Sequence, residues 1–222
     1  MLSQLTTNIK ASTPLNQKRG SHPKHAAVLL ALTSNEQNPS VILTKRAMHL
    51  NNHSGEVSLP GGKWEDQDES LMRTALRETH EEIGMQPDWV DVICNLPVAH
   101  TWQGIEVTPY VGVVAENLPL QPNPDELDAI FEVPLSFFLK DQRTRTDVFP
   151  REGGAVWSPA YDYQGYEIWG FTARLMVEFL NQFWGSELSR TNPAREKDWS
   201  KDPIYIERRK QALAAAARVK QQ

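Results

Sequence analysis

The feature that most constrains this chain is a stretch of helix formers, residues 70–85, that closely follows a glycine-rich turn. At about 100° per residue, its least polar positions fall within an arc of about 140°. These positions are Leu71, Ala75, Leu76, Thr79 and Ile83. The acidic side chains at 66–68 offer N-cap chemistry before it, and Gly84 is a suitable terminator. A helix with one apolar face needs a surface to cover, so the pattern predicts an amphipathic helix packed on a sheet.

Short apolar runs supply the expected sheet. Residues 25–33 (HAAVLLALT) and 41–45 flank a polar turn and read as adjacent buried strands. Further strands are expected at 90–100 and 105–115, within 125–139, and as a hairpin within 148–166. A second amphipathic helix is expected at 169–184. Mixed strands with two main helices indicate an α/β (α+β) fold, built as a sandwich.

Composition limits the class of protein. The chain has 222 residues, a formal charge of −5 and a single cysteine, Cys94, which excludes an intrachain disulfide and a multi-cysteine metal cluster. Its longest unbroken apolar run, 26–32, is far shorter than a membrane span, and the first twenty residues lack a secretory signal pattern. We therefore expect a cytoplasmic protein that does not enter a membrane. The acidic total makes nucleic acid an unlikely partner.

The charge is unevenly distributed along the chain. Residues 186–222 carry nine Lys/Arg and five Asp/Glu, a formal +4, so residues 1–185 carry −9. Residues 1–24 are polar and show no convincing period, so we expect a weakly ordered N-terminal extension. The organisation expected is this extension, one folded domain at 25–185, and a basic, partly helical C-terminal extension at 186–222. The helix-prone stretch of that last segment is 204–219.

Three carboxylates stand together on the first predicted helix. Glu78, Glu81 and Glu82 fall within an arc of about 100°, beside the apolar stripe. Like charges at this spacing repel each other, and a divalent cation such as Mg²⁺, which prefers oxygen ligands, would relieve that repulsion. The alternative is a solvated acidic helix face without a ligand.

The segment 61–85 resembles the signature of the Nudix hydrolases, G-x5-E-x7-R-E-U-x-E-E-x-G-U, where U is a bulky apolar residue. Glu69 and the run from 77 to 85 fit its second part. Two positions depart from it: six residues rather than five separate Gly62 from Glu69, and Thr79 stands where an apolar residue is usual.

This resemblance implies a Nudix-type α/β/α sandwich with a mixed sheet, and hydrolysis of a nucleoside diphosphate linked to another moiety. It implies that Glu78 and Glu82 ligate Mg²⁺ or Mn²⁺, with Glu81 as a further ligand or as the group that orients water. Arg77 would hold a glutamate in place, and the carbonyl of Gly62 would reach the metal. Glu78, Glu81 and Arg77 are thus the candidate catalytic residues.

The stretch before the glycine turn carries a second pattern. It reads Ile-Leu-Thr-Lys-Arg-Ala at 42–47 and Leu-Pro-Gly-Gly at 59–62. This is similar to L-L-T-x-R-[SA]-x3-R-x3-G-x3-F-P-G-G, the motif of the coenzyme A pyrophosphatase branch, and the spacing from its first arginine to its last glycine matches without a gap. Asn51 stands where that branch has Arg, and Leu59 where it has Phe.

The second resemblance implies cleavage of coenzyme A, or its thioesters, to 3′,5′-ADP and 4′-phosphopantetheine. Lys45, Arg46 and Gly61 are the candidate substrate-binding residues, since an arginine suits bidentate contact with a phosphate. The alternative for the two cations is a solvated strand end. Glu126 follows a proline-rich loop, where Nudix enzymes often supply another metal ligand or base; the alternative is an exposed loop acid.

Two other functions stay open. One is a Nudix hydrolase of ADP-ribose, nucleotide sugars or dinucleoside polyphosphates, with the same helix and a different recognition surface. The other is a non-catalytic Nudix-fold interaction or RNA-binding module, which the basic tail favours and the three intact glutamates disfavour. The partner expected is a small nucleotide substrate, and a homodimer is compatible with the sequence.

Overall fold

The computed structural model describes the chain except residues 1, 13, 14, 16, 102, 152, 153, 204, 208, 209 and 211–222. The helix-prone stretch 204–219 therefore lies largely outside the described residues. In the described part, no helix combines the length and the apolar character needed to cross a membrane.

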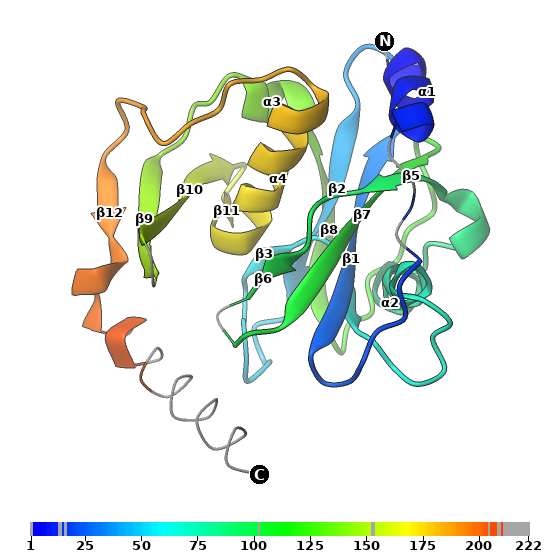
Figure 1. Cartoon of the computed structure of the whole chain (residues 1–222), viewed down its shortest axis with the longest axis horizontal. Helices are drawn as coiled ribbons and strands as arrows, with labels where there is room; N and C mark the ends of the chain where they lie inside the picture. The colour runs from blue at the N-terminus through cyan, green and yellow to red at the C-terminus, as the bar shows by residue number, and fades with distance from the viewer. Residues whose placement is uncertain are drawn as a thin grey trace.

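The chain order of the elements is seen in Figure 1. The helices are α1 (Leu2–Ser12), α2 (Leu71–Ile83), α3 (Leu135–Leu139) and α4 (Gly170–Phe183), with short 3-10 turns η1 (Pro87–Trp89) and η2 (Trp199–Lys201). The strands are β1 (His25–Thr33), β2 (Ser40–Arg46), β3 (Val57–Ser58), β4 (Gly61–Lys63), β5 (Asp91–Asn95), β6 (Ala99–His100), β7 (Glu106–Val114), β8 (Leu127–Pro134), β9 (Arg145–Arg151), β10 (Gly154–Tyr163), β11 (Tyr166–Ile168) and β12 (Glu196–Asp198).

The central sheet is mixed and has a split next to β1. Its main order is β3-β2-β1-β7-β5, with β8 on β2, β6 on β7, and β1 parallel to β7. β1 and β2 are in register only at Leu32 and Val41, whereas the first residues of β1 pair with β4. β4 therefore brings the glycine turn into the sheet beside β1, where β1 and β2 have separated.

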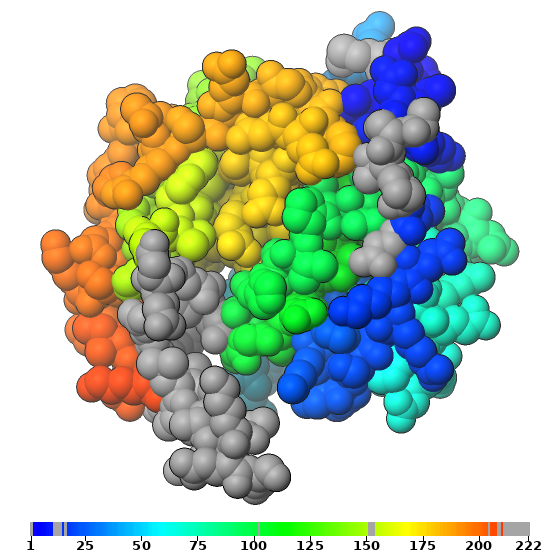
Figure 2. Space-filling view, in the orientation of Figure 1, coloured from blue at the N-terminus to red at the C-terminus, as the bar shows by residue number. Residues whose placement is uncertain are grey.

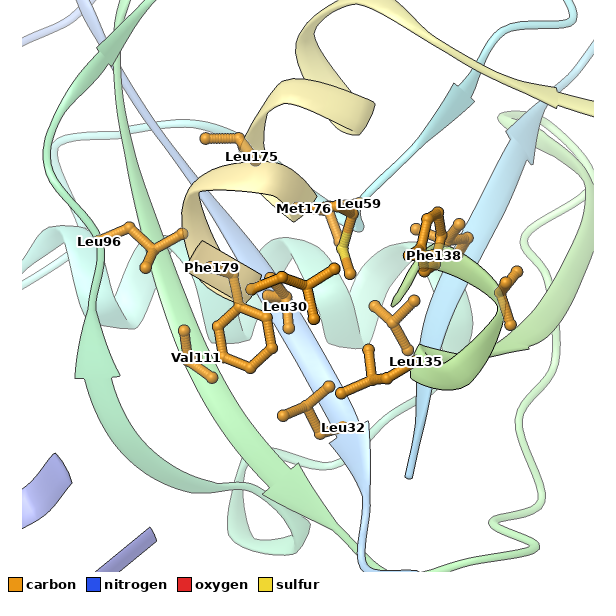
Figure 3. Packing of buried hydrophobic residues seen from close by; sticks show 14 of the residues in the cluster. Leu30, Leu32, Leu59, Leu96, Val111, Leu135, Phe138, Leu175, Met176 and Phe179 are labelled. Carbon is orange, nitrogen blue, oxygen red and sulfur yellow. The ribbon is translucent and has the colours of Figure 1, made fainter. Parts of the chain in front are cut away.

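Helices cover both faces of this sheet. Leu30 and Leu32 of β1 belong to the core cluster that includes α4, while Leu29 and Ala31 belong to the cluster that includes α2. The alternation explains why β1 reads as an unbroken apolar run, since both of its faces are buried. Figure 1 shows α4 and α2 on opposite sides of the strands, and Figure 3 shows the α4 side of the core. The expected α/β/α sandwich with a mixed sheet is confirmed.

The helix predicted at 70–85 is α2, and its ends have identifiable caps. The Ser70 hydroxyl accepts the N–H of Arg73 at 3.3 Å, and Gly84, at φ 71°, donates its N–H to the His80 carbonyl. A glycine suits this left-handed position because it has no Cβ to clash. The N-cap expected among residues 66–68 is wrong, because Ser70 fills that role and Asp68 bonds elsewhere.

A second, four-stranded sheet, in the order β11-β10-β9-β12, lies beyond α4 (Figure 1). The hairpin expected within 148–166 is present as β9 and β10, but β12 and its parallel pairing with β9 were not expected. β12 attaches the C-terminal segment to this sheet. The Trp199 indole then donates to the buried Asp147 carboxylate at 2.9 Å.

The N-terminal segment also differs from the expectation of weak order. Residues 2–12 form α1, whose Leu2 and Ile9 are buried in the core. Lys10 on the same helix bonds Asp91 of β5 at 2.7 Å. The helix forms because a few apolar side chains in a polar segment find a place on the sheet, which a search for a long period does not detect.

Candidate active site

The three glutamates of α2 sit in unlike surroundings. The Glu82 side chain is 3% exposed and that of Glu78 is 18% exposed, whereas that of Glu81 is 51% exposed. Glu78 and Glu82 are one helical turn apart and border the apolar stripe that packs on the sheet. The fold therefore places two of the carboxylates in the interface between α2 and the sheet, and leaves the third at the surface.

The glycine turn contacts the buried Glu82 and the half-buried Glu78. The N–H of Gly61 donates to the Glu82 carboxylate at 3.0 Å. A Cβ at Gly62 would lie 2.3–2.6 Å from the carboxylate atoms of Glu78, so no other residue fits there without displacing that group. Gly61 itself has φ 142°, and a Cβ on it would lie 2.3 Å from the Ala27 carbonyl oxygen. The two glycines thus permit close approach of β4 to the helix on one side and to β1 on the other.

Burial and crowding change the acidity of these groups. Burial raises the pKa of Glu82 to about 7, with the Glu126 and Glu78 carboxylates adding to it, while the Gly61 N–H and Arg46 act in the opposite direction. Burial also raises the pKa of Glu78, and Glu81 and Glu126 contribute, against the influence of Arg77. Removing water thus makes the ionised forms unfavourable at the point where negative charges gather.

Arg77 connects the glutamates to a buried aspartate. Its guanidinium donates to both Asp68 oxygens at 2.9 Å, to Glu81 at 3.1 Å, and lies 3.2 Å from Glu78. A further bond reaches the Lys63 carbonyl of β4 at 3.1 Å. The planar guanidinium therefore fixes two glutamates and the strand after the glycine turn in one arrangement.

Asp68 is the residue of this site that the sequence reading missed. It is 4% exposed, and also accepts the Thr74 hydroxyl at 2.9 Å and the Glu65 N–H at 3.0 Å. Burial acts to raise the pKa of Asp68, but the bonds from Arg77, Glu65 and Thr74 outweigh it, so this pKa lies below its ordinary value. Glu69, aligned to the signature by its distance from Arg77, is exposed. The sequence did hold a signal for Asp68: the signature has five residues between its glycine and its acid, and counting five residues on from Gly62 leads to Asp68 rather than to Glu69.

The second sequence pattern reaches the same site through Arg46. Its guanidinium lies 3.8 Å from the Glu82 carboxylate and is 28% exposed, so it can still contact a ligand. Lys45 stands two residues after Leu43, which belongs to the core cluster that includes α4, so these two residues share that face of β2; the strand register then shifts between Lys45 and Arg46. The structure therefore brings Arg46, but not Lys45, to the α2 side of the sheet.

Glu126 reaches the glutamates through the loop before β8. The Asn123 N–H donates to the carbonyl oxygen of Glu82 at 2.8 Å, and Ala47, just after β2, donates to the Glu126 carbonyl at 2.8 Å. Because the Glu126 carboxylate raises the pKa of both Glu78 and Glu82, it lies within electrostatic reach of both. The loop thus adds a further acid to the group, at the end of the helix and of β2.

The chemistry of this donor set suits a hard divalent cation. Glu78, Glu82 and Glu126 supply only oxygen ligands. Burial is the main cause that raises the pKa of Glu78 and Glu82, and repulsion from neighbouring carboxylates adds to it; a cation would offset that repulsion. Among the residues that the structure describes, no group of three His, Cys, Asp or Glu side chains is gathered closely enough to hold a metal ion. The donors therefore fit a divalent metal by type and charge, and some movement of their side chains has to accompany its binding.

Comparisons with known proteins agree with these motifs. The family model described as the NUDIX domain matches residues 23–151. An uncharacterized Nudix hydrolase, NudL, of Salmonella paratyphi B is 40% identical over 161 residues, which are 72% of this chain and 82% of the relative. Among solved structures, the Nudix hydrolase RenU of M. smegmatis is 26% identical, with a TM-score of 0.44 over 51% of this chain and 72% of its own. A MutT/nudix family protein of Enterococcus faecalis is 14% identical, with a TM-score of 0.45 over 83% and 70%. The family match and the NudL relative show that this chain belongs to the Nudix hydrolase family.

Proposed function

We propose that this Nudix hydrolase cleaves the diphosphate of coenzyme A, or of its thioesters, to 3′,5′-ADP and 4′-phosphopantetheine or its acyl derivative. The family acts on pyrophosphate bonds. The choice of coenzyme A rests on the pattern at 42–62, which is similar to the motif of the coenzyme A pyrophosphatase branch.

One observation carries this proposal: the two sequence patterns converge on Glu82. Arg46, from the coenzyme A-type pattern, lies 3.8 Å from its carboxylate, and Gly61, the first glycine of the Pro-Gly-Gly that ends the same pattern, donates its N–H to it at 3.0 Å. Arg46 of the recognition motif thus lies beside Glu82, the buried acid of the hydrolytic motif. This position supports a role for Arg46 in holding the diphosphate that is cleaved. An arginine can also partly neutralise the diphosphate charge in an otherwise acidic site.

Nudix hydrolases generally use divalent metals such as Mg²⁺ or Mn²⁺. In this chain Glu78 and Glu82 would hold the metal, with Glu126, Glu81 and the Gly62 carbonyl as further ligands. A bound divalent metal lowers the pKa of a coordinated water and neutralises diphosphate charge.

The side chains themselves have separable tasks in this proposal. Arg77, anchored by Asp68, holds Glu78 and Glu81 in position, which limits the reorganisation needed during the reaction. Glu81, the most exposed of the three glutamates, is placed to orient water from the solvent side. Arg46 contacts the substrate phosphates, and Gly61 allows their close approach to β4.

The test is a substrate panel with Mg²⁺ or Mn²⁺ present. Coenzyme A, ADP-ribose, NADH and a dinucleoside polyphosphate are compared by kcat/KM, with products identified by mass spectrometry. We expect coenzyme A to be preferred at least tenfold and to give the two stated products. A clear preference for a substrate without the pantetheine arm would refute the coenzyme A assignment while keeping the hydrolase. Metal-dependent hydrolysis of none of them, with salt-sensitive RNA binding, would favour the non-catalytic module.

A further inference from the structure

A groove of about 960 Å³ lies between α4, the segment around β6 and the second sheet. Its walls include Val98, which precedes β6, His100 of β6, Trp157 of β10, and Arg174 and Glu178 of α4. In Figure 2 the yellow atoms of α4 lie between the yellow-green atoms of the second sheet and the green atoms around β6. No motif discussed above contributes to this groove.

Most of the groove is formed by residues outside the stretch that the family model matches. That stretch ends at residue 151, and only the part around β6 lies within it, whereas β10, α4 and residues 188–189 follow it. The groove is therefore built largely by residues that the family model does not match.

The far wall of the groove is held rigidly. The Asn181 side chain bonds both the N–H and the carbonyl of Leu188, at 2.9 and 2.8 Å. The fully buried Arg143 donates to the Ser189 carbonyl at 3.0 Å, and its guanidinium lies 5.0 Å from the centre of the Trp157 ring. A wall that is already fixed costs little further ordering when a ligand binds.

The strand register places this groove near the glycine turn. Ala99, which lines the groove, pairs with Val107 of β7; Val107 pairs with Ala26 of β1, and Ala26 pairs with Lys63 of β4. Three spacings of about 4.8 Å each separate Ala99 from Lys63, or about 14 Å. An extended chain of about four peptide-like units spans that distance.

The lining favours a neutral ligand with hydrogen-bonding groups. The walls are mainly apolar, with Val98, Val177 and Trp157 among them. Arg174 and Glu178 add one charge of each sign, one helical turn apart, and can donate to a carbonyl and accept from an N–H. Burial raises the pKa of Glu178, against the influence of Arg174. The Glu178 carboxylate repels a phosphate, so this groove suits the 3′-phosphate of coenzyme A poorly.

We propose that this groove binds the uncharged, amide-bearing arm of the substrate, the pantetheine part if the substrate is coenzyme A. The proposal rests on the function proposed above, because it assumes that the diphosphate lies at the glycine turn. The groove then sets specificity: the α2 glutamates act on the diphosphate, and α4 with the second sheet recognise what is attached to it.

The test measures binding without turnover. Pantetheine and 3′,5′-ADP are titrated separately into the full-length protein in EDTA, by calorimetry. The variant is Gln182→Trp, at an exposed position of α4 that lines the groove, and the control is Thr7→Trp, at an exposed position of α1 that does not. We expect Gln182→Trp to weaken pantetheine binding at least tenfold and 3′,5′-ADP binding less than threefold, and Thr7→Trp to change neither by more than twofold.

The outcomes separate this proposal from the proposed function. Absence of pantetheine binding to the wild type, or equal binding to wild type and Gln182→Trp, would overturn the groove assignment even if coenzyme A is hydrolysed. Loss of 3′,5′-ADP binding instead would assign the groove to the nucleoside and also overturn it. Pantetheine binding that Gln182→Trp weakens would support the groove assignment even if coenzyme A is not hydrolysed, and the failure would then lie in the proposed reaction.

Discussion

Glu82 should destabilise the metal-free protein above neutral pH, and its replacement by glutamine should therefore stabilise it. The side chain is 3% exposed and its pKa is raised to about 7 from an ordinary value of 4.5, chiefly by burial. Such a group contributes stability that is complete below the unfolded-state pKa and is lost as the pH rises through the folded-state pKa. Glutamine keeps the shape and can still accept the Gly61 N–H.

The size of the effect follows from the two pKa values. At about 1.36 kcal/mol for each pKa unit, ionising Glu82 in the folded state costs about 3 kcal/mol at pH 8 and less than about 1 kcal/mol at pH 5. We expect Glu82→Gln to raise the free energy of unfolding by up to about 3 kcal/mol at pH 8, or about 6–12 °C in Tm. The measurement is urea or thermal unfolding of both proteins in EDTA at the two pH values.

Two results would show that ionised Glu82 does not destabilise the folded protein in this way. One is a variant that is less stable than the wild type at pH 8, which would mean that the ionised carboxylate makes favourable contacts. The other is an equal change at pH 5 and pH 8, which would show that the effect does not come from titration of Glu82. Added Mg²⁺ should stabilise the wild type more than the variant, because the carboxylate that repels its neighbours is also a proposed ligand.

Substitutions of the residues around the glutamates should have separable effects on stability and turnover. Asp68→Asn should lower the free energy of unfolding by about 3 kcal/mol, measured by chemical denaturation, because it breaks the ion pair of the buried Asp68 with Arg77. The same variant should lower kcat at least tenfold. The control Glu69→Gln, at an exposed position, should change the free energy of unfolding by less than about 0.5 kcal/mol. Gly62→Ala should lower kcat about 100-fold with little change in circular dichroism, because the new Cβ displaces the Glu78 carboxylate. Activity near that of the wild type would mean that catalysis does not need the Glu78 carboxylate at its present position. Arg46→Met should lower kcat/KM at least tenfold and Lys45→Met less than threefold, and the reverse order in steady-state assays would place the phosphates on the other face of the sheet.

Much of the fold could be predicted from local pattern. β1 and α2 could be predicted from the sequence alone. β1 is one continuous apolar run and α2 has one strong apolar period, and either pattern is buried whichever elements pack against it. α1 was not, because its few apolar side chains are stabilised by the sheet rather than by the helix itself. β12 was missed for a related reason: three polar residues become a strand only where β9 offers a free edge.

The site divides in the same way. The signature locates Glu78 and Glu82 because their spacing on a helix determines which face they share. The signature could not show which acid pairs with Arg77, because the extra residue after Gly62 changes the path of the loop. Only the folded loop buries Asp68 and leaves Glu69 exposed to solvent. Nor could the signature show that the pKa of Glu82 is raised to about 7, since that shift depends on burial by elements distant in the chain.

In the function proposed above, Glu78 and Glu82 of α2 hold the metal that cleavage of the coenzyme A diphosphate requires. The most direct test is hydrolysis of coenzyme A with Mg²⁺ or Mn²⁺ by wild type, Glu78→Gln, Glu82→Gln and the control Glu69→Gln, with products identified by mass spectrometry and folding checked by circular dichroism. We predict 3′,5′-ADP and 4′-phosphopantetheine from the wild type and the control, and at least a 100-fold lower rate from folded Glu78→Gln and Glu82→Gln. Near-wild-type turnover in both of those variants would show that neither glutamate is needed for the reaction.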